Sequence, residues 1–473
     1  MTTPNDDKEA HFLGSDWPEL LNIAQPTAEK IELGRALRKQ CPRSSHATWV
    51  AKPDREDPIS LLQFQDSFQH RLPDLLPVRY GRMMASPLAF FRGSALVMAN
   101  DLVQTPQSGL MVQCSGDCHL SNFGTYATPE RNIVFDLNDF DETLPGPWEW
   151  DLKRLTASIA VAAKHKGFSA STGEDCVRET VREYRKRMEG FAAMGSLELW
   201  YHRLNVVELV SNFRRPEKKV EMLAKLEKLK QKRTHDAAVA KLTQLVDGRR
   251  RIVDTPPLIV HHEEATPEFM QMILRGYLKT VLPAWQKLVT RYHFLDAALK
   301  TVGVGSVGTV AGIILLKGEG AGEDTIFLQI KQASESVLER FVGKSAFSHH
   351  GQRIVVGQRL LQAASDMFLG WTTGPKGRHY YVRQLMDVKG SIDIDDLDAM
   401  ALGHYGGVCG YALARAHART GDAAMLRGYM GTGEVIDEAI TKFAMSYAQQ
   451  NERDYQLLLD AIKKGKIAAT PGI

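Results

Sequence analysis

The sequence predicts an α+β protein in which a small strand-rich lobe lies between two parts of a larger helical lobe. Apolar residues recur at three- and four-residue intervals in two separate stretches, one after Leu61 and one after Leu397. Between them, apolar and β-branched runs bounded by glycine-rich turns predict antiparallel strands over 300–332 and 378–386. A chain of 473 residues is long for one core, so two lobes are expected.

The bulk composition excludes several classes of protein. A hydrophobic fraction of 44% and a charged fraction of 24% are typical of soluble globular proteins, and a net charge of +3 is too small to predict nucleic-acid binding. No apolar run reaches the roughly 18–20 residues that span a bilayer. Five scattered cysteines favour reduced thiols, and the polar, acidic N-terminus does not resemble a signal peptide, so a cytoplasmic protein is expected.

Five segments follow from these patterns along the chain. Residues 1–60 are polar and proline-rich and are expected to form a loosely packed N-terminal arm, and residues 61–210 the first part of the helical lobe. Residues 211–298 are expected to be a helical connector, with a charged amphipathic helix over 214–251 and another helix over 267–292. Residues 299–392 form the strand-rich lobe, with one helical piece near 350–365, and 393–473 return to the helical lobe.

A polar loop in the first helical segment carries the strongest chemical signal. Residues 115–123 read S-G-D-C-H-L-S-N-F, so Asp117 and Asn122 have the spacing of an Asp-x-x-x-x-Asn loop that serves phosphoryl transfer. In such a loop the carboxylate accepts a proton from the attacking hydroxyl, which is the role predicted for Asp117. The neutral side-chain carbonyl of Asn122 is a suitable ligand for a hard metal ion.

A second group of carboxylates follows shortly afterwards. Asp136 comes at the end of a predicted strand, I-V-F, where a second metal ligand is wanted. Asp139, Asp141 and Glu142 extend the acidic cluster. They either bind a second ion or a cationic substrate, or belong to an ordinary polar loop.

A glycine-rich loop lies far downstream, at V-G-V-G-S-V-G-T-V (302–310). Its Gly303, Gly305, Ser306 and Gly308 are predicted to bind phosphates, because two strands follow and the second ends at Lys331, where kinases keep a phosphate-binding lysine. No G-K-[ST] follows, which excludes a Walker-type loop. Backbone groups of Gln384, Leu385 and Met386 are the candidates for binding adenine.

The acidic partner that Lys331 requires is not evident from the sequence. Glu335 and Glu339 are near it in the chain, whereas the predicted helix G-Q-R-I-V-V-G-Q-R-L-L-Q contains no glutamate. A zinc site at Cys114, Cys118 and His119 is disfavoured because no second cysteine pair follows. No G-x-S-x-G or H-E-x-x-H motif supports a hydrolase.

The strings G-D-C-H-L-S-N-F, V-F-D and W-E-W-D-L resemble those of aminoglycoside-phosphotransferase-type and related bacterial kinases. The resemblance implies that Asp151 caps a helix and holds the catalytic loop. Ser115 departs from the family, which has histidine at this position, and Asp136-Leu137-Asn138 lacks the Phe-Gly of protein kinases. These departures favour a small-molecule or atypical kinase.

More narrowly, the chain resembles the uncharacterised bacterial family called domain of unknown function 2252. The strings that carry this resemblance span most of residues 80–455: S-P-L-A-F-F-R-G, G-D-C-H-L-S-N-F-G, V-F-D-L-N-D-F-D-E, V-G-V-G-S-V-G-T, G-Q-R-L-L-Q-A-A-S-D and Y-Y-V-R-Q-L. That family is grouped with kinase-like folds by resemblance, which does not supply a substrate.

Together these resemblances imply a circularly permuted, protein-kinase-like fold that uses ATP and Mg²⁺ to phosphorylate a hydroxyl group on a small molecule or a protein. Two alternatives stay open: transfer of AMP to a protein, and a catalytically inactive nucleotide-binding protein. The permuted arrangement requires Lys331 and Asp136 within about 10 Å of each other in one cleft. Residues 303–308 should cover that cleft, and the amide oxygen of Asn122 should point toward Asp136. The sequence does not indicate an oligomeric state.

Overall fold

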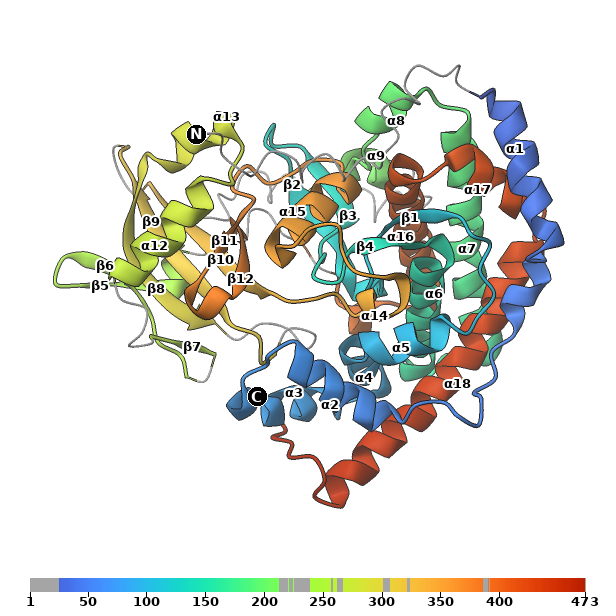
Figure 1. The fold of residues 1–473 in the computed structure, drawn as a ribbon, viewed down its shortest axis with the longest axis horizontal. Coiled ribbons are helices and arrows are strands. Elements are labelled where there is room, and N and C mark those ends of the chain that lie inside the picture. The colour runs from blue at the N-terminus through green and yellow to red at the C-terminus, as the bar shows by residue number, and fades with distance from the viewer. Residues whose placement is uncertain are drawn as a thin grey trace, which may run out of the picture.

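The structure is a computed structural model that describes residues 25–211, 220, 224, 239–256, 258–261, 267–300, 307–320, 324–385, 390 and 392–472. It is a mixed α+β fold with a helical lobe on one side and a six-stranded antiparallel sheet on the other (Figure 1). No helix in these ranges is both long and apolar enough to cross a membrane.

Four long helices form the centre of the helical lobe: α6 (Trp148–His165), α7 (Ala170–Ala192), α16 (Ala399–Thr420) and α18 (Val435–Lys463). Helix α16 packs closely along α7. Gly406 and Gly410 permit this approach because they have no side chain, and a Cβ atom at either position would overlap Thr180. The carboxylate of Asp398 caps α16 by accepting a hydrogen bond from the Ala401 N–H. Segments before and after the sheet therefore share one hydrophobic core, as the alternation of patterns predicts.

Shorter helices surround this core. Before the first strand lie α1 (Thr27–Ala36), α2 (Pro58–Phe68), α3 (Leu76–Met83), α4 (Pro87–Gly93) and α5 (Ala95–Leu102); later come α8 (Ser196–Tyr201), α9 (Val206–Ser211) and α17 (Ala423–Met430). The C-terminal segment ends beside α3 (Figure 1), where the Thr470 N–H donates to the Pro77 carbonyl over 2.8 Å.

The described part of the predicted N-terminal arm is fixed to the helical lobe by buried charges. Helix α1 packs on α17, and Arg55 forms ion pairs with Asp101 at 2.7 Å and Asp454 at 2.6 Å. The Arg55 side chain is only 9% exposed. This segment is therefore packed more firmly than the sequence suggests.

Two short antiparallel ladders frame the polar loops of the helical lobe. Strand β1 (Met111–Cys114) pairs with β4 (Leu144–Pro147), and β2 (Phe123–Ala127) pairs with β3 (Ile133–Leu137). The loop 115–122 lies between β1 and β2, and the acidic loop 138–143 lies between β3 and β4. Both loops are thereby held at the same edge of the lobe.

The small lobe contains a sheet with the strand order β11-β12-β10-β9-β8-β7. Its strands are β7 (Ile259–Val260), β8 (Tyr292–Lys300), β9 (Ala311–Gly318), β10 (Thr325–Ala333), β11 (Gly370–Thr373) and β12 (His379–Gln384). Helices α12 (Pro267–Leu278) and α13 (Pro283–Val289) contribute to the apolar cluster on the sheet. The short α14 (Glu339–Val342) and α15 (His350–Leu361) follow β10, and α15 lies between the sheet and the helical lobe (Figure 1).

Two predicted boundaries in the connector differ from the structure. Residues 243–252 form a hairpin of β5 (Thr243–Val246) and β6 (Arg249–Ile252), whereas the sequence predicted a helix there. Asp247 and Gly248 have positive φ angles of 49° and 73°, as a two-residue Asp-Gly hairpin turn requires. Strand β8 begins at Tyr292, before the predicted boundary at 299, and much of 214–238 lies outside the described residues.

Candidate functional site

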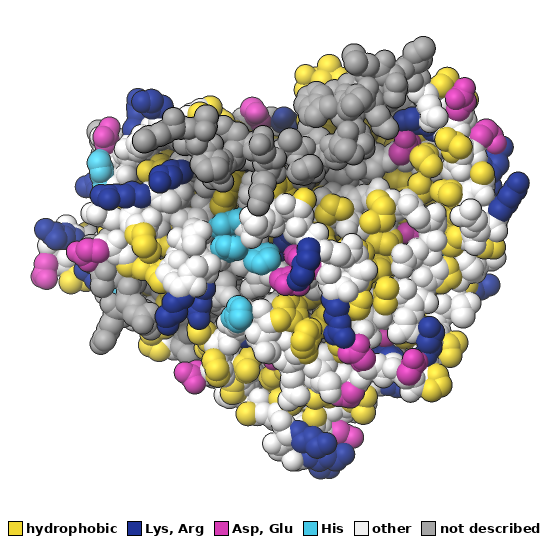
Figure 2. Space-filling model, in the orientation of Figure 1, with side chains coloured by type: hydrophobic (Ala, Val, Ile, Leu, Met, Phe, Trp, Pro, Cys, Tyr) yellow, Lys and Arg dark blue, Asp and Glu magenta, His cyan; other side chains and the backbone are white. Residues whose placement is uncertain are grey.

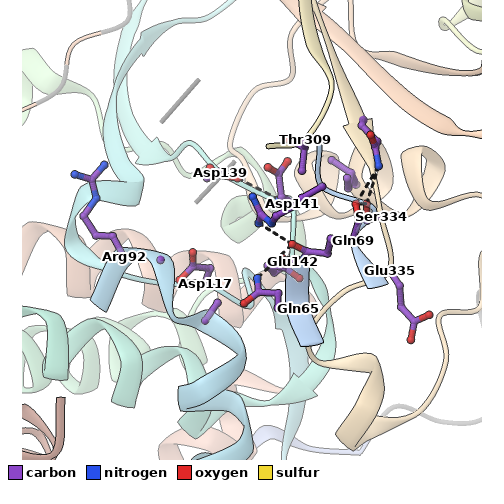
Figure 3. A pocket seen from close by; sticks show the side chains of 15 residues that line it. Gln65, Gln69, Arg92, Asp117, Asp139, Asp141, Glu142, Thr309, Ser334 and Glu335 are labelled. Atoms are coloured by element: carbon purple, nitrogen blue, oxygen red, sulfur yellow. Dashed lines mark hydrogen bonds between the residues drawn. The ribbon is translucent and has the colours of Figure 1, made fainter. Parts of the chain in front are cut away.

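A polar pocket opens between the two lobes, with an empty volume of about 590 Å³ that includes space open to solvent. Figure 3 shows its side chains converging from the helical lobe and from the strand-rich lobe. The lining residues are Gln65, Gln69, Arg71, Arg92, Gly93, Ala95, Asp117, Asp139, Asp141, Glu142, Thr309, Gln332, Ser334, Glu335 and Ile354.

The loop that carries Asp117 is held in place by the first turns of α6. The Asp151 carboxylate accepts hydrogen bonds from the Ser115 N–H at 2.6 Å and the Gly116 N–H at 3.0 Å. Gly116 has a φ of 85°, and a side chain there would overlap the Glu142 carbonyl. Asp151 thus holds the loop, as the kinase resemblance implies, but it does not cap α6, which begins after Pro147.

Asp117 lies on the pocket wall with its side chain 19% exposed. Its Oδ1 accepts a hydrogen bond from the Arg154 Nε at 2.5 Å, and Arg154 also donates to the Phe91 carbonyl. Burial raises the pKa of Asp117, although the Arg154 charge opposes that effect. The group is therefore a stronger base than an exposed aspartate while still facing the pocket.

Asn122 closes the same loop from its other end. The Asn122 Nδ2 donates to the Asp117 carbonyl at 2.8 Å, and its backbone N–H donates to the His119 carbonyl at 2.8 Å. This orientation leaves the amide Oδ1 as the atom able to bind a cation. Asn122 does not itself line the pocket, but it fixes the residue that does.

Asp136 lies away from the pocket lining, at the centre of a buried ion pair. Its two oxygens accept from Arg415 Nη2 at 2.7 and 2.9 Å. They also accept from the backbone N–H groups of Leu137 and Ala363. Four hydrogen bonds use the acceptor capacity of a carboxylate, so this geometry disfavours the metal-binding role predicted for Asp136.

The carboxylates of the following loop face the pocket instead. Asp139 and Asp141 line it together with Glu142. Burial raises the pKa of Asp139, and the neighbouring charge of Asp141 adds to that effect. Burial also raises the pKa of Glu142, to about 7. The hydrogen bond that its carboxylate accepts from the Val337 N–H lowers the pKa and only partly offsets this effect.

Lys331 reaches this acidic loop from the sheet. Its Nζ lies 2.6 Å from Asp141 Oδ2, while the Tyr381 hydroxyl donates to Asp141 Oδ1 at 2.8 Å. Burial alone would lower the pKa of Lys331 and raise that of Asp141. The attraction between the two charges outweighs it, so the pKa of Lys331 is raised and that of Asp141 is lowered.

Neither partner considered from the sequence pairs with Lys331. Glu335 forms an ion pair with Lys344, and Glu339 accepts hydrogen bonds from the backbone N–H groups of Ser336 and Ser345. The charge that balances Lys331 comes from Asp141, at a sequence separation of 190 residues.

The end of the glycine-rich loop lies at the same pocket. Gly308 has a φ of 92°, and its carbonyl accepts a hydrogen bond from the Leu72 N–H at 2.7 Å. Thr309 lines the pocket. Gly303, Gly305 and Ser306 lie outside the described residues, so the covering of the cleft by residues 303–308 stays a prediction.

The predicted adenine-binding segment lies beyond the pocket lining. The backbone N–H of Gln384 donates to the Asp366 carboxylate at 2.6 Å, and that of Leu385 donates to the Phe327 carbonyl at 2.9 Å. Met386 lies outside the described residues. The two described donors are therefore engaged by the protein.

The roles of two arginines at the site were not predicted from the sequence, because they depend on tertiary contacts. Arg154 lies one helical turn after Asp151, and so approaches Asp117 from the same side of α6. Arg353 of α15 donates to the carbonyls of Asp141 and Thr143, and so fixes the acidic loop. The only local signal for the role of Arg154 was its spacing from Asp151. The sequence contained no local signal for the role of Arg353.

The donors present fit a magnesium ion that is bound together with phosphates. No group of three histidine, cysteine, aspartate or glutamate side chains in the described ranges forms a metal cage of its own. Mg²⁺ in phosphoryl-transfer sites takes one or two protein carboxylates, and phosphates and waters supply the other ligands. Asp139, whose carboxylate contacts no described cation, is the best-placed donor.

Comparison with known protein families shows the family to which the chain belongs. A family model described as "Uncharacterized protein conserved in bacteria (DUF2252)" matches residues 71–461. The chain belongs to the DUF2252 family. The matched range of this DUF2252 protein includes Lys331 and every pocket residue except Gln65 and Gln69. No curated protein and no solved structure gives a significant match.

Proposed function

We propose that this DUF2252 protein is a kinase-like phosphotransferase that uses ATP and Mg²⁺ to phosphorylate a hydroxyl group. The observation that carries the proposal is the contact between Lys331 of the sheet and Asp141 of the helical lobe, because Asp141 lines the same pocket as Asp117 and Thr309. Phosphoryl transfer needs this combination: a cation for the phosphates, carboxylates for metal and proton, and a glycine-rich loop.

The arrangement of the small lobe gives further support. The glycine-rich segment joins β8 to β9, and Lys331 lies on β10, the next strand of the antiparallel sheet. Protein kinases place their phosphate-binding lysine on the third strand, after a glycine-rich loop. In this chain the loop with Asp117 comes first, so the proposed fold is a circular permutation of that order.

Asp117 is the proposed base. The acceptor oxygen attacks the γ-phosphorus, and the bond from that phosphorus to the β–γ bridging oxygen breaks, so ADP leaves with the electron pair. The hydroxyl proton passes to Asp117, whose raised pKa suits it to accept the proton. Arg154 holds the carboxylate in position for this step.

Mg²⁺, when bound, would neutralise charge that develops on the transferring phosphoryl group. Asp139 is the proposed carboxylate ligand, with Asn122 Oδ1 as the neutral one. Lys331 would contact the phosphates, and the charge of Asp141 keeps its ammonium protonated. The acceptor is a small molecule or a protein side chain, and the five buried, unpaired cysteines accord with a proposed cytoplasmic location.

Two labels of ATP separate the proposal from its alternatives. Incubation of the full chain with Mg²⁺ and a mixture of acceptors should transfer label from γ-labelled ATP and none from α-labelled ATP. Asp117→Asn should lower that transfer by about 10²- to 10⁴-fold, the usual contribution of a general base, while the rise in melting temperature with ATP persists. Transfer of the α-label would instead indicate AMP transfer, and ATP binding without transfer would indicate an inactive nucleotide-binding protein.

A further inference from the structure

Arg92, at the end of α4, lines the pocket together with Asp117. Among the contacts of the described residues, no hydrogen bond or ion pair joins its guanidinium to another group, and its Nε is buried without a partner. Burial lowers the pKa of Arg92, and the more distant charges of Asp117 and Asp139 only partly oppose that effect. The structure thus places a cation at the site without a directly bonded anion.

Neighbouring arginines differ from Arg92 in this respect. Arg71, which also lines the pocket, donates to the Val307 carbonyl and pairs with Asp66. Arg154 pairs with Asp117. Burying the Arg92 Nε–H without an acceptor costs free energy, so a ligand that supplies acceptors to this guanidinium would be bound favourably.

The position of Arg92 indicates which ligand this is. In Figure 3, Asp117 lies between Arg92 on one side and Thr309, Ser334 and Glu335 on the other. If ATP phosphates occupy the side of Thr309, the attacking hydroxyl must approach the γ-phosphorus from the side opposite to the leaving ADP, past Asp117, because phosphoryl transfer is in line. Arg92 lies on that opposite side.

We infer that the acceptor carries an anionic group, a carboxylate or a phosphate, near its reactive hydroxyl, and that Arg92 binds this group and determines specificity. Arginine suits the task because its planar fork binds either anion through two parallel hydrogen bonds. This inference rests on the proposed function and adds the chemical class of the acceptor to it.

Three matched probes test the inference: glycerol, glycerate and glycerol 3-phosphate, which share a hydroxyl framework and differ in charge. Calorimetric titration of each into the full chain, with a nonhydrolysable ATP analogue and Mg²⁺ present, should show at least one anion binding about tenfold or more tightly than glycerol. Arg92→Met should remove that preference, and Arg92→Lys should keep part of it. Arg35→Met, which removes an exposed arginine of α1, should change nothing.

The stability of the variants separates binding from a structural role. Because the guanidinium has no partner in the described structure, Arg92→Met should have an unchanged or higher melting temperature. A clear loss of stability would make Arg92 a structural residue and overturn the inference.

The remaining outcomes are also decisive. Equal binding of all three probes, or an anion preference that survives Arg92→Met, overturns the inference and leaves the proposed function intact. Weaker binding of the ATP analogue to Arg92→Met would assign Arg92 to the phosphates of the nucleotide and overturn it as well. If the analogue does not bind the wild-type protein, the proposed function fails, and with it the assignment of an acceptor.

Discussion

The Lys331 Nζ lies 2.6 Å from Asp141 Oδ2, which joins the third long strand of the sheet to the acidic loop of the helical lobe. The Lys331 side chain is buried, at 4% exposed, whereas that of Asp141 is 27% exposed and faces the pocket. Tyr381 and Arg353 fix the same loop from β12 and α15. The two lobes are therefore connected at the point where the proposed chemistry takes place.

Lys331→Met should abolish ATP-dependent stabilisation and lower transfer by about 10²-fold or more, because it removes a donor to the developing charge. It should also lower the melting temperature, since Asp141 loses its cationic partner. The double variant Lys331→Met with Asp141→Asn should recover part of the stability and none of the ATP response. Lys344→Met, which removes an exposed ion pair with Glu335, is the matched control and should resemble wild type.

Asp136 and Asp139 should respond in opposite ways to conversion to asparagine. Asp136→Asn breaks the fully buried pair with Arg415, so we expect a loss of about 3–5 kcal/mol of unfolding free energy. Asp139→Asn should leave stability unchanged or raised, because it removes repulsion with Asp141. It should, however, remove the Mg²⁺ dependence of ATP binding. Denaturant unfolding and ATP titrations with and without Mg²⁺ measure both effects. Loss of the Mg²⁺ dependence in Asp136→Asn, with loss of stability in Asp139→Asn, would identify Asp136 as the metal ligand instead.

Gly116 and Gly109 share a φ of 85° but differ in their surroundings. At Gly109 an added side chain meets nothing within 4 Å, whereas at Gly116 it overlaps the Glu142 carbonyl. Gly109→Ala should therefore cost only backbone strain, about 1–3 kcal/mol. Gly116→Ala should cost clearly more and should also lower transfer, since it displaces Asp117. Equal losses of unfolding free energy would show that the loop does not pack on Glu142 in this way.

The raised pKa of Glu142 should make the free energy of unfolding depend on pH. Its pKa is about 7 in the folded chain, against 4.5 for an ordinary glutamate. Between these values the folded state binds more protons than the unfolded state, so the contribution of this group falls as pH rises from about 4.5 to 7 and is constant above. The total change is on the order of 3 kcal/mol.

The variant Glu142→Gln isolates this contribution from other titrating groups. Its unfolding free energy relative to wild type should improve between pH 5 and pH 8, because glutamine does not ionise. Glu32→Gln removes an exposed carboxylate and serves as the control. A wild-type-to-variant difference that is independent of pH would contradict the buried, proton-binding state of Glu142.

Helical periodicity and glycine-bounded apolar runs located α6, α16, α18 and strands β9, β10 and β12, because these patterns depend on residues close together in sequence. The Asp-x-x-x-x-Asn spacing likewise located Asp117 on the pocket wall. The hairpin over 243–252 was missed because the charged pattern before it was extended past Asp247-Gly248, which is itself a strong turn signal.

The partners of the site residues could not be predicted, because they depend on long-range packing. Lys331 pairs with Asp141 rather than with a nearby glutamate, and no local pattern specifies that contact. In V-F-D-L-N-D-F-D, the end of the strand favoured Asp136 as the metal ligand. Burial against Arg415, visible only in three dimensions, keeps Asp136 out of the pocket lining, whereas Asp139 faces the pocket.

A crystal structure of the full chain with a nonhydrolysable ATP analogue and Mg²⁺ tests the central claim most directly. The account predicts the γ-phosphate between Lys331 and Asp117, the metal on Asp139, and residues 303–308 over the phosphates. An α-phosphate facing Asp117 would contradict phosphoryl transfer in favour of AMP transfer. A nucleotide bound elsewhere, with the pocket between Lys331 and Asp117 empty, would contradict the account as a whole.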